Sequence, residues 1–285
     1  FTHGHGRGPR PPLRRTTASW SVCSASVHST PPTDASEMCN SAVVSIDRYE
    51  FPYPSPAAVA EHPFDRLDFR RYSSAEMAGR ADDLHQLMDR RRSVRMLSDE
   101  PVPVGLIEAA VRTASTAPSG AHQQPWQFIA ISDPATKREI RLAAEAEERI
   151  NYEEHRMNDA WQHELAPLGT DWHKEFLEIA PWIVVLFEER YGIRDDGSKR
   201  THYYVKESCG IAAGMFITAL HNMGLATLTH TPTPMAFLTK LLGRGAHERP
   251  FVLFPVGFPV EDCQVPRLAR KPLDQVLTII GPDPQ

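Results

Sequence analysis

Apolar positions at helical spacing predict amphipathic helices in the first half of this chain. Leu84 and Leu87 share one face of a helix predicted over 75–90. A second helix begins at Pro103, because proline suits the first turn, and ends near Pro118. These helices predict a folded domain that follows the N-terminal region.

Continuous apolar runs predict the strands. The run 182–187 has the character of a central strand, since no polar residue interrupts it. Strands are also predicted over 127–132, 225–231 and 251–257. Strands and helices do not alternate strictly. The pattern therefore favours an α+β sandwich over a doubly wound sheet.

Two further helices are predicted in the centre of the chain. Asp133 and Pro134 have the chemistry of an N-cap and a first turn, and the charged stretch 135–164 after them is expected to be helical and to face solvent. The most apolar helix, 203–222, stops at Gly224.

Small residues and a terminal apolar segment suggest further contacts. Gly210 and Gly214 lie four residues apart in the apolar helix, which suits either a subunit interface or a core helix. The tail 273–280 is apolar although it is terminal, so it is expected to dock on a sheet.

The composition is that of an ordinary globular protein. The chain has 285 residues, 41% hydrophobic and 24% charged, with a net charge of −5. This balance gives no reason to expect nucleic acid as a partner. No apolar run approaches the roughly 18–20 residues of a membrane span, so a soluble cytoplasmic or other intracellular protein is expected.

The N-terminal region and the cysteines add little chemistry. Residues 1–60 are rich in Pro, Ser, Thr and Gly and are predicted to be a disordered extension, with the folded domain over 61–285. An acid-poor segment rich in Arg and Ser is also typical of organelle targeting. The four cysteines are widely spaced, which predicts neither a disulfide framework nor a zinc site.

A basic cluster and a tight turn carry the first functional signal. The sequence Arg91-Arg92-Ser93-Val94-Arg95 places three guanidinium groups and a hydroxyl in five residues, which suits a phosphate monoester. Alone, the cluster is more typical of a solvated helix end, where cations suit the helix dipole. The Pro118-Ser119-Gly120 turn would let backbone N–H groups approach a ligand before the 127–132 strand.

The order of these motifs resembles the FMN-dependent nitroreductase superfamily, in which R-R-S-x-R precedes a small-residue turn and Q-P-W-x-F. Other strings, among them 113–122, 147–152, 172–176, 202–204, 227–232 and 270–275, resemble the iodotyrosine deiodinase family. The resemblance covers about residues 85–280. It implies a nitroreductase-like α/β sandwich with a mostly antiparallel central sheet flanked by helices, in an intertwined homodimer.

The resemblance also implies a set of FMN-binding residues. Arg270 matches a second phosphate contact. Thr231 matches a hydroxyl that hydrogen-bonds flavin N5, which favours single-electron over hydride transfer. His230 departs from the family's threonine and is expected to change the flavin potential if it faces the ring. The implied FMN-binding residues are Arg91, Arg92, Ser93, Val94, Arg95, Pro118, Ser119, Gly120, Thr229, His230, Thr231 and Arg270.

The resemblance implies a substrate lid over about 145–178. Glu148 and Tyr152 lie four residues apart, so a helix presents both on one face. With Lys174 they match a trio that binds a free amino acid zwitterion, although without the resemblance the pair is an exposed charged helix with an incidental aromatic. Ala121 matches a backbone N–H that hydrogen-bonds a phenolate oxygen.

The implied activity is FMN-dependent reductive dehalogenation of halogenated tyrosines or related halophenols. No nicotinamide fingerprint is present in the sequence, so NAD(P)H is expected to act through a separate flavin reductase. Two alternatives remain open: a general nitroreductase or quinone reductase that uses NAD(P)H directly, and a non-catalytic flavin-binding or ligand-binding protein.

Overall fold

The computed structural model describes residues 54–154 and 156–281. The chain divides into two compact units, the second of which spans Arg71–Gln285. In the first unit, the described residues form helix α1 (Pro56–Glu61). Residues 1–53, most of the predicted N-terminal extension, lie outside the described residues.

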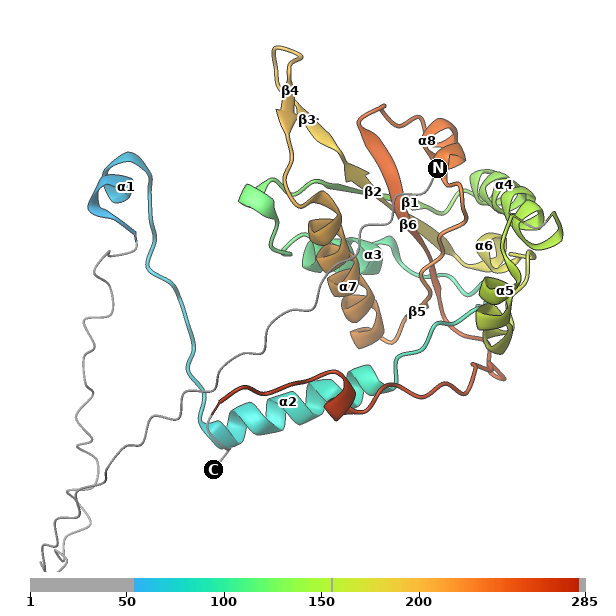
Figure 1. Ribbon diagram of the computed structural model, residues 1–285, viewed down its shortest axis with the longest axis horizontal. Helices are drawn as coiled ribbons and strands as arrows, with labels where there is room; N and C mark the ends of the chain where they lie inside the picture. Colours follow the sequence, from blue (N-terminus) through green and yellow to red (C-terminus); the bar gives the residue numbers. More distant parts are fainter. Residues whose placement is uncertain (1–53, 155, 282–285) are drawn as a thin grey trace, which may run out of the picture. The chain divides into compact units, whose positions relative to one another are not determined.

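The second unit is built on an antiparallel sheet with the strand order β1-β2-β6-β5 (Figure 1). This arrangement confirms the predicted α+β sandwich. The strands are β1 (Trp126–Ile131), β2 (Trp182–Glu189), β5 (Ala226–Thr227) and β6 (Glu248–Gly257). The strand predicted over 225–231 is too long, since pairing stops at Thr227 and resumes only as a bridge between His230 and Leu253.

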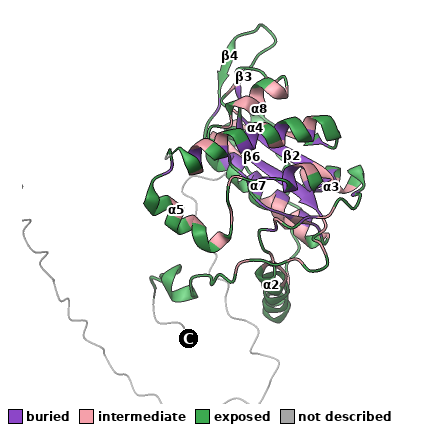
Figure 2. Ribbon diagram, turned by 90° about the vertical axis from the view of Figure 1, so that its right-hand side faces the viewer, coloured by how far each residue is buried: buried purple, intermediate pink, exposed green. Residues whose placement is uncertain are grey.

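Helices cover both faces of this sheet. Alternate residues of β2 point to opposite sides, and the apolar side chains on each side are buried against helices. Val184 and Leu186 belong to a core shared with α3 and α7, while Ile183, Val185 and Phe187 pack with α4, α6 and α8. Figure 2 shows the buried residues concentrated in β2 and β6. The helices are α3 (Val104–Ala114), α4 (Pro134–Glu153), α6 (Phe176–Ile179), α7 (Val205–Asn222) and α8 (Ala236–Leu241).

Further elements complete the second unit. Helix α2 lies close to its predicted bounds, and α5 belongs to the predicted lid region. Among the described helices, none has the length and apolarity that a membrane span requires. The remaining elements are α2 (Ser74–Asp89), η1 (Gly120–His122), α5 (Asp159–Leu165), η2 (Ala166–Leu168), β3 (Tyr191–Ile193), β4 (Lys199–Thr201) and η3 (Leu273–Gln275).

The charged helix predicted over 135–164 differs from the prediction in two ways. The Asp133 side chain caps α4 as expected, accepting the Thr136 N–H at 2.7 Å, but the helix ends at Glu153. One face of α4 is also buried and carries polar residues, including Glu145 and Glu148. The alternating charges concealed this face because ion pairs and hydrogen bonds compensate its burial.

The C-terminal tail does not dock on the sheet of this chain, so that prediction is wrong here. Every residue from Lys271 to Gly281 is exposed, and Ile280 is 97% exposed.

Helix α7 is a core helix along Cys209, Ala212 and Phe216, yet its Gly210 and Gly214 lie on an exposed face.

Candidate functional site

The arginine cluster lies at the edge of the sheet rather than at a solvated helix end. Helix α2 ends at Asp89, and the chain then pairs with β5 through a bridge between Ser93 and Thr227. The Val94 N–H donates to the Thr227 carbonyl at 3.2 Å, and the Val94 side chain is buried. This anchoring fixes the backbone from which the arginines on both sides of Val94 extend.

Arginines from two distant segments meet around a cavity of about 210 Å³. Arg270 reaches the cluster through hydrogen bonds from Nη1 to Asp89 Oδ1 at 2.6 Å and from Nη2 to the Arg91 carbonyl at 3.1 Å. We call this cavity the basic corner. Its polar lining is Arg91, Arg92, Ser93, Arg95 and Arg270.

The electrostatics of the basic corner fit a phosphate group. Burial, and then the charges of Arg270 and Arg92, lower the pKa of the Arg91 guanidinium. Burial also lowers the pKa of Arg95. Among the described residues, neither Arg91 nor Arg95 forms an ion pair with a carboxylate. An anion with several acceptor oxygens would relieve this repulsion, which is the property of a phosphate monoester.

A second cavity, of about 150 Å³, lies beneath the predicted lid, and we call it the lid cavity. Glu148 and Tyr152 line it from one face of α4, as their spacing predicts. Lys174 enters from the segment before α6, and its Nζ lies 3.7 Å from Glu148 Oε2. Arg95 lines both the lid cavity and the basic corner, so the two cavities adjoin.

Glu148 and Lys174 form a buried pair whose mutual attraction does not fully offset the cost of removing both charges from water. Their side chains are 12% and 3% exposed. Burial raises the pKa of Glu148 more than Lys174 lowers it, and burial lowers the pKa of Lys174 more than Glu148 raises it. Both groups thus shift toward their neutral forms, because desolvation exceeds their attraction. A ligand with an ammonium and a carboxylate would give each charge a further partner.

Tyr152 completes the polar wall of the lid cavity. Its hydroxyl donates to the Thr170 carbonyl at 3.4 Å, and the Lys174 ammonium lies 5.7 Å from its ring centroid. Burial, followed by the charge of Glu148, raises the pKa of the phenol. Tyr152 is therefore a neutral hydroxyl beside the ion pair.

The three residues Thr229, His230 and Thr231 also line the lid cavity, but they differ in exposure. The two threonines are exposed, whereas His230 is buried beside Phe176 with the rings edge to face. His230 Nε2 has no hydrogen-bond partner among the described residues. Burial, and then the charges of Lys174 and Arg95, lower its pKa to about 3.

The low pKa of His230 predicts a loss of stability in acid. The folded protein keeps this imidazole neutral, whereas the unfolded chain protonates it below about pH 6.5. Stability therefore falls as the pH drops from about 6.5 toward 3. We expect His230→Gln to remove this dependence. The gap between the unfolding free energies of the two proteins should then shift by up to about 1.4 kcal/mol per pH unit.

Urea denaturation of both proteins at about pH 7.5 and about pH 5 tests this expectation. The gap should be constant above neutrality, where His230 is neutral in both states. A gap that does not change between the two pH values would contradict a buried neutral imidazole.

The predicted turn has the backbone geometry that the sequence suggests. A Cβ on Gly120 would lie 2.4 Å from the Tyr203 carbonyl oxygen, so only glycine fits. Ala121 has φ +50°, in the left-handed region, and its N–H has no acceptor among the described residues. Pro118 and Ser119 lie just before this turn.

This turn and the basic corner lie at opposite ends of α7. The Gly120 N–H donates to Ser208 Oγ at 3.3 Å in the first turn of the helix. His221 Nε2, in the last turn, lies 2.9 Å from the Leu87 carbonyl near the arginines. The rise between these two helix positions is about 20 Å. One chain therefore does not bring all the predicted residues into one cavity.

Sequence reasoning missed two polar residues of the lid region. Asn151 lines the lid cavity and donates from Nδ2 to the Thr233 carbonyl at 3.1 Å. Glu145 accepts a hydrogen bond from the Lys174 N–H. Both lie three residues from Glu148, so the helical spacing that pairs Glu148 with Tyr152 also marks them.

Comparison with known proteins identifies the family. The family model described as "Nitroreductase family" matches residues 88–258 of this chain. The chain belongs to the nitroreductase family. Within this family it is 50% identical to an iodotyrosine deiodinase of Haliscomenobacter hydrossis, over 73% of this chain and 94% of that protein. It is 44% identical to iodotyrosine deiodinase 1 of Homo sapiens, over 73% and 72% of the two chains.

The fold of this nitroreductase-family chain is also similar to solved structures. A crystal structure of oxidized iodotyrosine deiodinase bound to FMN and 3-iodo-L-tyrosine matches 71% of this chain and all of that one, with a TM-score of 0.60 and 27% identity. A nitroreductase with bound FMN from Bacteroides fragilis matches with a TM-score of 0.52 at 19% identity, which supports the fold alone. Both parts of the resemblance seen in the sequence are confirmed.

Proposed function

We propose that this chain is an FMN-dependent oxidoreductase that removes halogen reductively from halogenated tyrosines. The observation that carries the proposal is the buried pair Glu148–Lys174, whose two charges lack full compensation, in a cavity that adjoins a cluster of arginines. The similarity to iodotyrosine deiodinases, and to one solved with FMN and 3-iodo-L-tyrosine, supports the same substrate and cofactor.

The basic corner would hold the FMN phosphate. Arg91 and Arg95 provide guanidinium donors that have no carboxylate partner within residues 54–154 and 156–281, and Ser93 adds a hydroxyl. Thr229 and Thr231 line the adjoining cavity, where the Thr231 hydroxyl would donate to the ring edge. When bound and reduced, FMN would supply two electrons. Together with a proton, these would replace the carbon–halogen bond with a carbon–hydrogen bond and release the halogen as halide.

The lid cavity would bind the amino acid part of the substrate. The Glu148 carboxylate would pair with the ammonium, Lys174 with the carboxylate, and the Tyr152 hydroxyl would lie between them. The lid over 145–178 would exclude water from the reacting ring. The Ala121 N–H would donate to the phenolate oxygen, which favours the ionised halophenol.

We also propose that the active form is a homodimer. The turn at Gly120 and the basic corner lie at opposite ends of α7, so a flavin that contacts both needs the turn of a second copy. Exposed apolar residues on α7 and in the tail, such as Ile211 and Ile280, provide surface for this contact. Sedimentation that finds the FMN-loaded protein monomeric would refute this arrangement.

Reduced FMN-loaded protein is expected to release halide from 3-iodotyrosine. In the experiment, dithionite reduces the protein without oxygen, 3-iodotyrosine is added, and iodide and tyrosine are measured. One iodide and one tyrosine should form for each reduced flavin. We expect NAD(P)H to support turnover only with a separate reductase.

Two other outcomes would point to different functions. Rapid oxidation of NADPH with nitroaromatic compounds, together with no binding of 3-iodotyrosine, would indicate a general nitroreductase or quinone reductase. Tight binding of 3-iodotyrosine without release of iodide would indicate a non-catalytic binding protein.

A further inference from the structure

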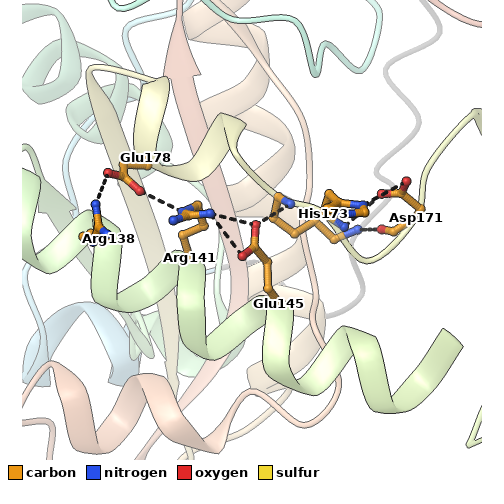
Figure 3. A network of polar contacts seen from close by, with 7 residues as sticks. Arg138, Arg141, Glu145, Asp171, His173 and Glu178 are labelled. Carbon is orange, nitrogen blue, oxygen red and sulfur yellow. Dashed lines mark hydrogen bonds and ion pairs between the residues drawn. The ribbon is translucent and has the colours of Figure 1, made fainter. Parts of the chain in front are cut away.

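A network of polar contacts, buried at Glu145 and Lys174, connects α4 to the segment that carries Lys174 (Figure 3). Glu145 is 8% exposed, and its Oε1 accepts the backbone N–H of Lys174 at 2.9 Å. Arg141 donates to Glu145 Oε2 at 3.2 Å and to Glu178 Oε2 at 2.7 Å. Glu145 thus joins two parts of the lid region that are far apart in sequence.

The network fixes the backbone of the residue whose side chain enters the lid cavity. Glu145 and Glu148 lie three residues apart on one face of α4. The first carboxylate contacts the Lys174 N–H, and the second lies near the Lys174 ammonium. One helix therefore contacts both the backbone and the ammonium of Lys174. The ammonium also donates to the Asp171 carbonyl and to Thr170 Oγ1.

We propose that Glu145 is a positioning residue that holds Lys174 in place for the substrate carboxylate. This inference rests on the proposed function. Between α4 and Lys174 the chain runs through residues 154–173, which include the short elements α5 and η2. On the other side, Lys174 lies just before α6, whose Phe176 and Leu177 are buried. The hydrogen bond that the Lys174 N–H donates to Glu145 adds a direct tie to α4 at the point where the long connection joins α6. Without this bond, the ammonium would occupy several positions, and fewer of them would reach the carboxylate.

Removal of the acceptor at position 145 should weaken the binding of amino acid substrates selectively. Glu145→Met retains the aliphatic stem without an oxygen, and Glu145→Ala provides a second variant if the first does not fold. Calorimetric titration of the FMN-loaded proteins should show 3-iodotyrosine binding about tenfold more weakly. Binding of 2-iodophenol, which has no carboxylate, should change less than twofold.

Two further variants separate positioning from general stability. Glu145→Gln keeps a carbonyl acceptor for the Lys174 N–H, so it should recover most of the affinity for 3-iodotyrosine. Glu153→Ala is the matched control, because Glu153 pairs with Arg149 on the exposed side of the same helix. It should bind both ligands like the wild type.

Hydrogen exchange gives a readout that needs no substrate. In Glu145→Met, the peptide that contains Lys174 should exchange faster than in the wild type and in Glu153→Ala. Equal weakening of both ligands, or unchanged exchange at Lys174, would overturn the role of Glu145. Failure of the wild type to bind 3-iodotyrosine would instead overturn the proposed function.

Discussion

Arg91→Met protein is expected to bind FMN about 10- to 100-fold more weakly than the wild type. Arg91 lines the basic corner and has no carboxylate partner among the described residues, so its guanidinium is available for a phosphate. Loss of one charge-assisted hydrogen bond costs about 1.5–3 kcal/mol, which gives this range. Fluorescence titration of the FMN-free protein with FMN measures the change.

The same substitution should have the opposite effect on the FMN-free protein. Burial and the charges of Arg270 and Arg92 lower the pKa of Arg91, so its charge is unfavourable when no anion is bound. FMN-free Arg91→Met should therefore melt no lower than the FMN-free wild type. Excess FMN should raise the Tm of the wild type more than that of the variant.

Arg112→Met is the matched control for this experiment, because Arg112 is exposed on α3 and lines neither cavity. It should bind FMN like the wild type. If Arg91→Met bound FMN with unchanged affinity, the basic corner would not be the phosphate site.

The second large effect is expected from Glu148→Gln, which should bind 3-iodotyrosine about 100-fold more weakly. The amide cannot pair with the substrate ammonium as a charge, and the substitution also removes the ion-pair partner of the buried Lys174. 2-Iodophenol has no ammonium, so its affinity should be nearly unchanged. Quenching of flavin fluorescence by each ligand provides both dissociation constants.

The pH dependence of binding gives a further check on Glu148. Burial raises the pKa of this carboxyl group above its ordinary value, so it becomes neutral at a higher pH than an exposed glutamate. Wild-type affinity for 3-iodotyrosine should fall as the pH drops through this raised pKa, while Glu148→Gln should not follow this change. Glu153→Gln, an exposed substitution on the same helix, should behave like the wild type. Similar affinities for wild type and Glu148→Gln would exclude Glu148 from the substrate site.

Local patterns in the sequence predicted much of the fold. Asp133 caps α4, the apolar run at 182–187 lies within the central strand β2, and Gly224 follows α7 with φ +82°. Each of these features depends on a few neighbouring residues, whose backbone preferences or apolar character act over one turn or one strand.

The sequence did not predict the end of α4 or the exposure of the tail. The charges of 135–164 mostly alternate in sign, yet the helix stops at Glu153 and buries Glu145. Apolar residues of the tail, such as Ile280, are exposed. Their apolar character suggests that the tail packs against another surface, but the sequence does not specify which surface that is.

For the site, the sequence determined the two local groups: the arginines around Val94, and Glu148 with Tyr152 on one helical face. Spacing rules reach only about four residues along a chain, so they specify which side chains share a turn or a face. The tertiary structure decided that Lys174 meets Glu148, that Arg95 joins the two cavities and that His230 is buried. These facts depend on how distant segments pack, and packing also sets the desolvation that shifts the pKa of each group.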